Sequence, residues 1–170
     1  MSVWPATSLD MEPLGTPRPL FGGAASAEIA SLLERAMDSH ADTQLAETLL
    51  WQAQRMDANA LPVYFSLYKF YFYKGNLEQA ELAARMALLA AAMQAGFNAD
   101  WRGLHQDSAD WTDHAAPAHF YLFSLKALAF IRLRCGVAAE ASAILAKLAE
   151  LDPRDSVGAS VIRSIAQGAG

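Results

Sequence analysis

The chain has 170 residues, of which 54% are hydrophobic and 18% are charged, so a chain that stays disordered throughout is excluded. This length suits a single domain with one core. The net charge of −5, with no basic stripe, argues against a nucleic-acid partner. The longest uncharged apolar stretch is too short to span a bilayer, and the N-terminus lacks the pattern of a signal peptide. We therefore expect no membrane association, a cytoplasmic location and, from the high alanine content, a helical fold.

The first 25 residues differ from the rest of the chain. Four prolines and the Gly22-Gly23 pair interrupt any helix here, so residues 1–25 are expected to lack regular structure. Residues 26–170 are expected to form one helical domain. Ser26 suits the start of its first helix, because a serine hydroxyl can accept a hydrogen bond from a free backbone amide and Glu28 follows in the first turn.

A pair of helices is predicted over residues 61–94. The two helices meet at Lys74-Gly75-Asn76, where Gly75 can adopt the left-handed backbone that ends a helix. Ala80, Ala84 and Ala87 follow at helical spacing. Their small side chains let the second helix pack closely against the first.

The same pattern recurs along the chain. A shift of 61 residues places Gly75 on Gly136 and Leu67 on Leu128, and a shift of 34 residues in the other direction places Leu67 on Leu33. A pattern that repeats in units of about 34 residues indicates stacked helical units. The sequence therefore predicts three helix pairs, at about 27–60, 61–94 and 122–155.

Two segments lie outside these pairs. Residues 95–121 form an insert between the second and third pairs and are expected to be an ordered loop. Residues 156–167 carry an apolar stripe at helical spacing. They predict a C-terminal capping helix that covers the open face of the last pair.

Helix–turn–helix units with this length and this spacing of glycine and alanine resemble the tetratricopeptide repeat (TPR). The resemblance implies an all-α fold, a right-handed superhelix of three repeats followed by the capping helix. In size and repeat number the chain is similar to the translocator chaperones of type III secretion. The stretches LPVYFSLYKFYFYKG and PAHFYLFSLKALAF also resemble small bacterial repeat proteins encoded near nitrogen-fixation genes.

In the TPR family one side of each repeat's first helix lines a concave groove. Carried over to this chain, the groove residues are Phe65, Lys69, Phe72, Tyr73, Lys126, Phe130, Arg134 and Arg35. Aromatic anchors with basic groups fit a partner segment that carries apolar and acidic residues. The expected function is therefore an adaptor or chaperone that binds a peptide segment of another protein. The alternative is that Phe72 and Phe130 pack against neighbouring helices while the cations are solvated.

The insert supplies a second candidate site, formed by Trp101, His105 and Trp111. Two tryptophans in a polar segment need burial. Histidines and aspartates nearby leave open a metal-binding or catalytic site, although their spacing matches no compact metal motif. Motifs for phosphate binding or a nucleophilic serine are also missing, so we expect no enzyme activity, no cofactor and no metal. A self-associating structural module, a homo-oligomer, is the third possibility.

Overall fold

The computed structural model describes residues 25–168, so the predicted irregular segment, residues 1–25, lies outside the described residues except for Ala25. Seven α-helices make up most of the described part: α1 (Ala27–Asp38), α2 (Thr43–Met56), α3 (Leu61–Tyr73), α4 (Leu77–Ala95), α5 (Pro117–Arg134), α6 (Ala138–Leu151) and α7 (Ala159–Gly168). Two 3₁₀ turns, η2 (Trp101–Gly103) and η3 (Gln106–Ser108), lie between α4 and α5. Residues 25–168 contain no strand, which confirms the all-α class for this part of the chain.

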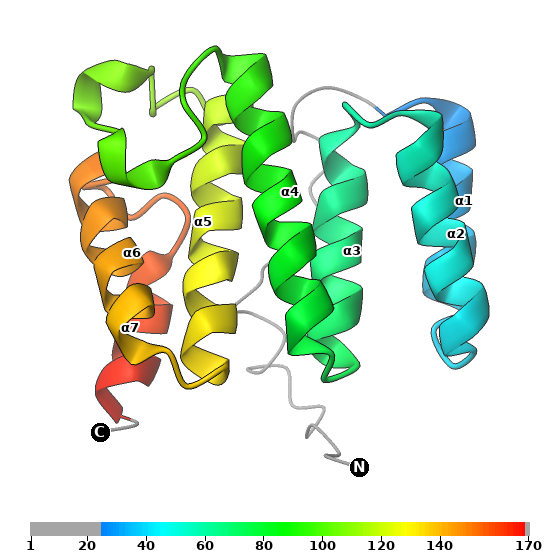
Figure 1. Ribbon diagram of the computed structural model, residues 1–170. Coiled ribbons are helices and arrows are strands. Elements are labelled where there is room, and N and C mark those ends of the chain that lie inside the picture. The colour runs from blue at the N-terminus through cyan, green and yellow to red at the C-terminus, as the bar shows by residue number, and fades with distance from the viewer. Residues whose placement is uncertain (1–24, 169–170) are drawn as a thin grey trace.

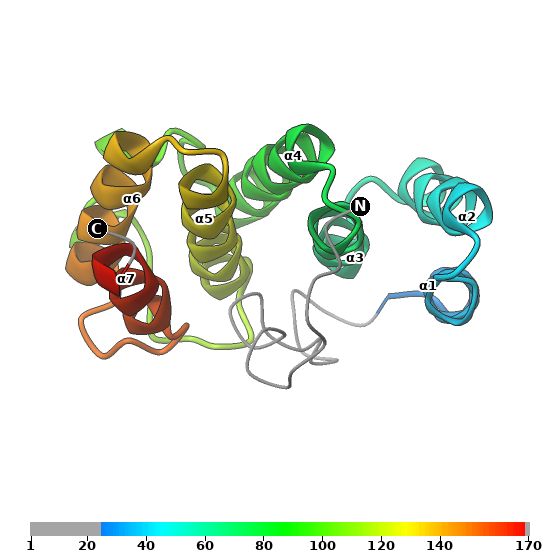
Figure 2. The same ribbon diagram turned by 90° about the horizontal axis from the view of Figure 1, so that it is seen from below.

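The helices form two rows, which Figure 1 shows from the side and Figure 2 from below. In Figure 2, α1, α3, α5 and α7 make one row, and α2, α4 and α6 make the other. Within each pair the two helices are antiparallel and pack side by side, and α4 also packs against α5. The first row curves, so that α1 and α7 lie to the same side of α3 and α5 (Figure 2). We call that side the concave side.

Glycine closes the turns of the second and third pairs, as predicted. Gly75 has a φ of +78° and Gly136 a φ of +80°. The amide of Gly75 donates to the carbonyl of Phe72 at 3.0 Å, and the amide of Asn76 donates to that of Tyr71 at 2.9 Å. The same two hydrogen bonds recur around Gly136. They satisfy carbonyls that the end of a helix would otherwise leave without a partner.

The repeated frame correctly marks positions in the core. The residues at its small and large apolar positions are buried: Ala46, Leu50, Ala53, Leu67, Ala80, Ala84, Ala87, Leu128, Ala141, Leu145 and Leu148. Leu33, in the first pair, is only half-buried. The predicted start of the first helix is also confirmed, because the hydroxyl of Ser26 accepts a hydrogen bond from the amide of Ile29 at 3.3 Å.

Two expected boundaries are wrong. The third pair begins at Pro117 rather than near 122, since proline fits the first turn of a helix, where its missing amide hydrogen removes no helical hydrogen bond. The insert therefore ends at residue 116. The last helix begins at Ala159 rather than at 156, because Asp155 and Gly158 have φ of +54° and +74°, which a helix does not accommodate. None of the helices in residues 25–168 is long and apolar enough to cross a membrane.

Candidate functional site

Aromatic side chains join α3 to α5. The ring centroids of Phe72 and Phe130 lie 4.9 Å apart, and those of Phe65 and Phe123 lie 5.7 Å apart. Phe65, Phe72 and Phe130 are 2%, 5% and 2% exposed, respectively. The expectation that Phe72 and Phe130 pack against a neighbouring helix is therefore confirmed, and the structure brings these predicted site residues together.

Lys126 lies between the aromatic residues of α5 and is 4% exposed. Its ammonium donates a hydrogen bond to the carbonyl of Val157 at 2.7 Å and lies 4.6 Å from the ring centroid of Phe123. The expectation of a solvated cation is wrong for this residue, because Lys126 is buried and its ammonium is bonded to a backbone carbonyl of the connection before α7. Phe123, Lys126 and Phe130 share one face of α5, and this face meets α3 on one flank and Val157 on the other. Figure 2 shows α3 and α7 as the neighbours of α5 in the first row, so the contacts of the shared face are with this row.

The remaining predicted residues are more accessible. Lys69 is half-buried, with its ammonium 5.4 Å from the ring centroid of Phe65, and burial lowers the pKa of Lys69. Tyr73 is half-buried beside Phe72 and Arg134 is exposed at the end of α5. We call the seven residues of these two helices the α3–α5 surface: Phe65, Lys69, Phe72, Tyr73, Lys126, Phe130 and Arg134. Arg35 does not join it, since Arg35 is exposed in the last turn of α1 at the end of the row.

The formally charged side chains of α3 and α5 are all basic. The sequences of α3 and α5 contain Lys69, Lys126, Arg132 and Arg134 and no aspartate or glutamate. The protein as a whole has a net charge of −5. Acidic side chains are thus absent from the two central helices of the first row.

The insert folds as an aromatic cluster. Trp111 packs on Phe97 and Tyr121, with ring centroids 5.3 and 6.5 Å away, and Trp101 lies under the guanidinium of Arg102. Both tryptophans are buried, as expected, whereas His105 is exposed. The indole nitrogen of Trp111 donates to the carbonyl of His105 at 3.3 Å, so these two predicted residues lie together.

Backbone carbonyls fix the insert to the last pair. Lys147 of α6 donates to the carbonyl of Leu104 at 2.7 Å, and Gln106 donates to the carbonyl of Glu150 at 2.6 Å. Across residues 25–168, no group of three or more histidine, cysteine or acidic side chains is arranged to hold a metal ion. The insert therefore presents a packed structural element, with no arrangement that supports the metal-site alternative.

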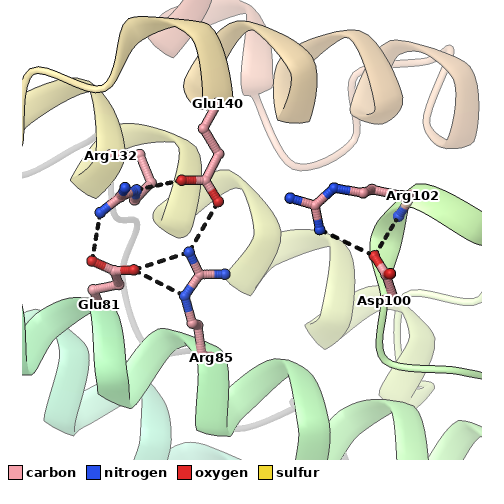
Figure 3. Close-up of polar contacts among 6 residues, drawn as sticks. All are labelled: Glu81, Arg85, Asp100, Arg102, Arg132 and Glu140. Atoms are coloured by element: carbon pink, nitrogen blue, oxygen red, sulfur yellow. Dashed lines mark hydrogen bonds and ion pairs between the residues drawn. The ribbon is translucent and has the colours of Figure 1, made fainter.

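Sequence analysis missed a network of four charged residues at the junction of three helices (Figure 3). Arg132 of α5 lies 2.5 Å from Glu140 of α6 and 2.6 Å from Glu81 of α4. Arg85 bridges the same two carboxylates at 2.9 Å each. The spacing of Glu81 and Arg85 by four residues is the one signal for this network in the sequence, since the other pairs depend on how α4, α5 and α6 come together.

Each charge in this network stabilises its neighbours. Burial by itself disfavours the charged form of Glu140, but hydrogen bonds from Arg85 and Arg132 and their positive charges outweigh it, so the pKa of Glu140 is lowered. Burial likewise opposes the charge on Arg132, and its bond to Glu140 and the charges of both carboxylates raise its pKa. The network is neutral overall, which leaves Lys69, Lys126 and Arg134 as the cations of the α3–α5 surface.

The chain is similar in sequence to a bacterial protein whose description gives its size and its genomic location. No family model matches the chain, and no solved structure matches it. A curated relative is the "uncharacterized 19.8 kDa protein in nifW 5'region" of Azotobacter chroococcum mcd 1, which is 29% identical over 128 residues. The match covers 71% of this chain and 68% of the relative. The resemblance to proteins encoded near nitrogen-fixation genes is confirmed at this level, as similarity to a bacterial protein.

Proposed function

We propose that the chain is a TPR-like binding module of the bacterial cytoplasm that holds a segment of another protein on its α3–α5 surface and catalyses no reaction. The helix pairs, the glycine-closed turns and the burial of the repeated positions support this proposal. A right-handed superhelix of three repeats, with α7 as the cap, is part of the same proposal.

The observation that carries the proposal is the pairing of aromatic and basic residues on two helices that have no acidic residue. Aromatic rings supply most of the affinity in a protein interface, since they bury large apolar area. Basic groups at the edge of such a surface favour acidic partners and speed association. The ligand proposed is therefore a segment that alternates apolar and acidic residues.

A display library of random peptides tests this proposal, and the selected peptides should be rich in aromatic or aliphatic residues next to Asp or Glu. Because Phe72 and Phe130 are buried against each other, their replacement would also loosen the core. Arg134→Glu is the better variant, with Arg55→Glu as a matched control, since both arginines are exposed in the last turn of a helix and Arg55 belongs to the second row.

An exposed ion pair contributes about 0–1 kcal/mol, so Arg134→Glu should weaken peptide binding up to about fivefold and Arg55→Glu should leave the affinity unchanged. Adding Lys69→Glu to Arg134→Glu should weaken it further. Thermal unfolding of each variant checks that the fold persists. A library that yields no binders, or peptides that bind all variants equally, would reject the α3–α5 surface as the binding site.

Self-association is the second candidate, and one feature favours it. Leu82, Leu89 and Met93 lie on one face of α4 and are exposed. A second copy of the chain would bury this apolar stripe. Sedimentation at several concentrations tests it: the dimer fraction should rise with concentration, and Leu89→Glu should abolish the rise. A sedimentation coefficient that does not change with concentration contradicts this candidate.

A further inference from the structure

The N-terminal segment, residues 1–24, has the composition of the ligand proposed above. Its stretch Leu9-Asp10-Met11-Glu12 alternates apolar and acidic residues. In an extended backbone this alternation puts Leu9 and Met11 on one side and the two carboxylates on the other. Proline fixes φ and disfavours a helical conformation in the residue before it, so the four prolines of the segment reduce the conformational entropy lost when an extended segment binds.

The concave side of α5 is already covered. Residues 118–131 are all buried, so α5 is buried around its whole circumference. The second row and the flanking helices α3 and α7 account for three of its sides, and Figure 2 shows none of the helices of residues 25–168 lying across the concave side of α3 and α5. A partner segment therefore reaches the α3–α5 surface only by displacing other parts of this chain.

The N-terminal segment is long enough to reach this surface. The N-termini of α1, α3 and α5 all lie on the same side of the molecule, at the top in Figure 1. With axes of packed helices about 8–10 Å apart, α5 lies about 20 Å from α1. The roughly 14 residues between Glu12 and the start of α1 span up to about 45 Å when extended.

We propose that residues 1–24 bind in cis across the concave side of α3 and α5, and that a partner segment competes for the same place. Leu9 and Met11 then pack on the aromatic rings, and Asp10 and Glu12 face the basic side chains of Lys69 and Arg134. This inference rests on the proposed function and adds to it a regulatory step. A covalent tether gives a segment a local concentration in the millimolar range, so a partner must bind the open surface tightly to displace it.

Peptide binding to the full chain tests the proposal, with a fluorescein-labelled peptide of residues 1–24 as the probe. In the wild type the chain's own segment competes with the probe. Two full-length variants, Leu9→Ser/Met11→Ser and Asp10→Lys/Glu12→Lys, weaken that competitor, so both should bind the probe at least tenfold more tightly than the wild type. Thr7→Ser/Thr16→Ser is the matched control, because it changes neither an apolar nor a charged residue of the segment.

A nitroxide label on Cys135 gives an independent readout. Cys135 is the single cysteine of the sequence and is exposed directly after Arg134. In the wild type the label should broaden the NMR signals of residues 9–12, and the Asp10→Lys/Glu12→Lys variant should lose this broadening. Broadening that arises only between labelled and unlabelled molecules in a mixture would show that the occupant belongs to a second copy and would overturn binding in cis.

Equal probe affinity for the wild type and both variants, without broadening, overturns the inference. If library peptides still bind in that case, the proposed function stands alone. If the probe binds the variants while no library peptide does, the N-terminal segment occupies the surface and the proposed function fails.

Discussion

The contacts between α2 and α3 and between α4 and α5 join successive helix pairs at equivalent places, yet they use different chemistry. In the first, the indole of Trp51 donates to the hydroxyl of Tyr71 at 2.7 Å, and this hydroxyl donates to Glu47 at 2.7 Å. In the second, α4 packs against α3 on one side and α5 on the other, and it carries a series of buried alanines: Ala80, Ala83, Ala84, Ala87, Ala90, Ala91 and Ala92.

α4, with its small side chains, makes extensive contact with both α3 and α5. The contact between α2 and α3, which uses larger polar side chains, is much smaller. Apolar burial contributes about 25 cal/mol for each Å² removed from water, while a hydrogen bond adds about 1 kcal/mol net because water competes for it. The pair α1 and α2 should therefore be the less stable end of the molecule, and it should open before α3–α6 unfolds.

The largest difference is expected at the equivalent positions Leu128 and Leu33. Leu128 is fully buried in α5, so Leu128→Ala should lower the free energy of unfolding by about 2–5 kcal/mol through the cavity it leaves. Leu33 is half-buried in α1, so Leu33→Ala should cost less than half as much. Urea unfolding measures both values. Equal losses would show that the two ends of the molecule are packed alike.

Removing Arg132 should have the next largest effect, because it leaves Glu81 and Glu140 with Arg85 alone. Hydrogen bonds to charged groups contribute about 1.5–3 kcal/mol, so Arg132→Ala should destabilise by an amount in this range. Arg102→Ala is the control, since the pair of Arg102 with Asp100 in Figure 3 is exposed and water screens its attraction, so its loss should have a smaller effect.

The pH dependence of the same variant sharpens this test. The pKa of Glu140 is lower in the folded chain than in the unfolded chain. Its stabilising effect is therefore present above the ordinary glutamate pKa and is lost as the pH falls through the folded value. The wild type should lose stability on acidification more steeply than Arg132→Ala. Parallel curves would show that the network contributes nothing to acid stability.

The smallest effect is expected in the polar contact between the first and second pairs. Tyr71→Phe removes the hydroxyl that links Trp51 to Glu47 and should cost about 1 kcal/mol. Amide hydrogen exchange should then become faster in α1 and α2 and remain unchanged in α4 and α5. Faster exchange throughout the molecule would mean that the first pair is not a separate unit.

Alkaline unfolding tests the same hydroxyl. Burial, together with the hydrogen bond and charge of Glu47, raises the pKa of Tyr71 to about 12, against a lowering effect of the bond from Trp51. A raised folded pKa contributes stability that is present below the unfolded value near 10 and is lost as the pH rises toward 12. Because Phe does not ionise, the stabilities of Tyr71→Phe and the wild type should converge over this range. A constant difference would contradict the role given to the hydroxyl.

Much of the candidate site was accessible to sequence reasoning, but the state of its residues was not. The placement of Phe72 and Phe130 on neighbouring helices followed from the repeated frame, and the structure adds that their rings lie 4.9 Å apart and are buried. The contact of Lys126 with Val157 joins residues 31 positions apart, and no local pattern signals it. The same holds for the contacts of Arg132 with Glu81 and Glu140.

The helices, the glycine turns at Gly75 and Gly136 and the buried face of each pair could be predicted, because helical spacing and left-handed glycine are local properties of the chain. The polar contact of α2 with α3, the docking of the insert and the burial of Lys126 could not be predicted from local patterns. These depend on the close packing of segments distant in sequence, where a few tenths of an ångström separate a good contact from a clash.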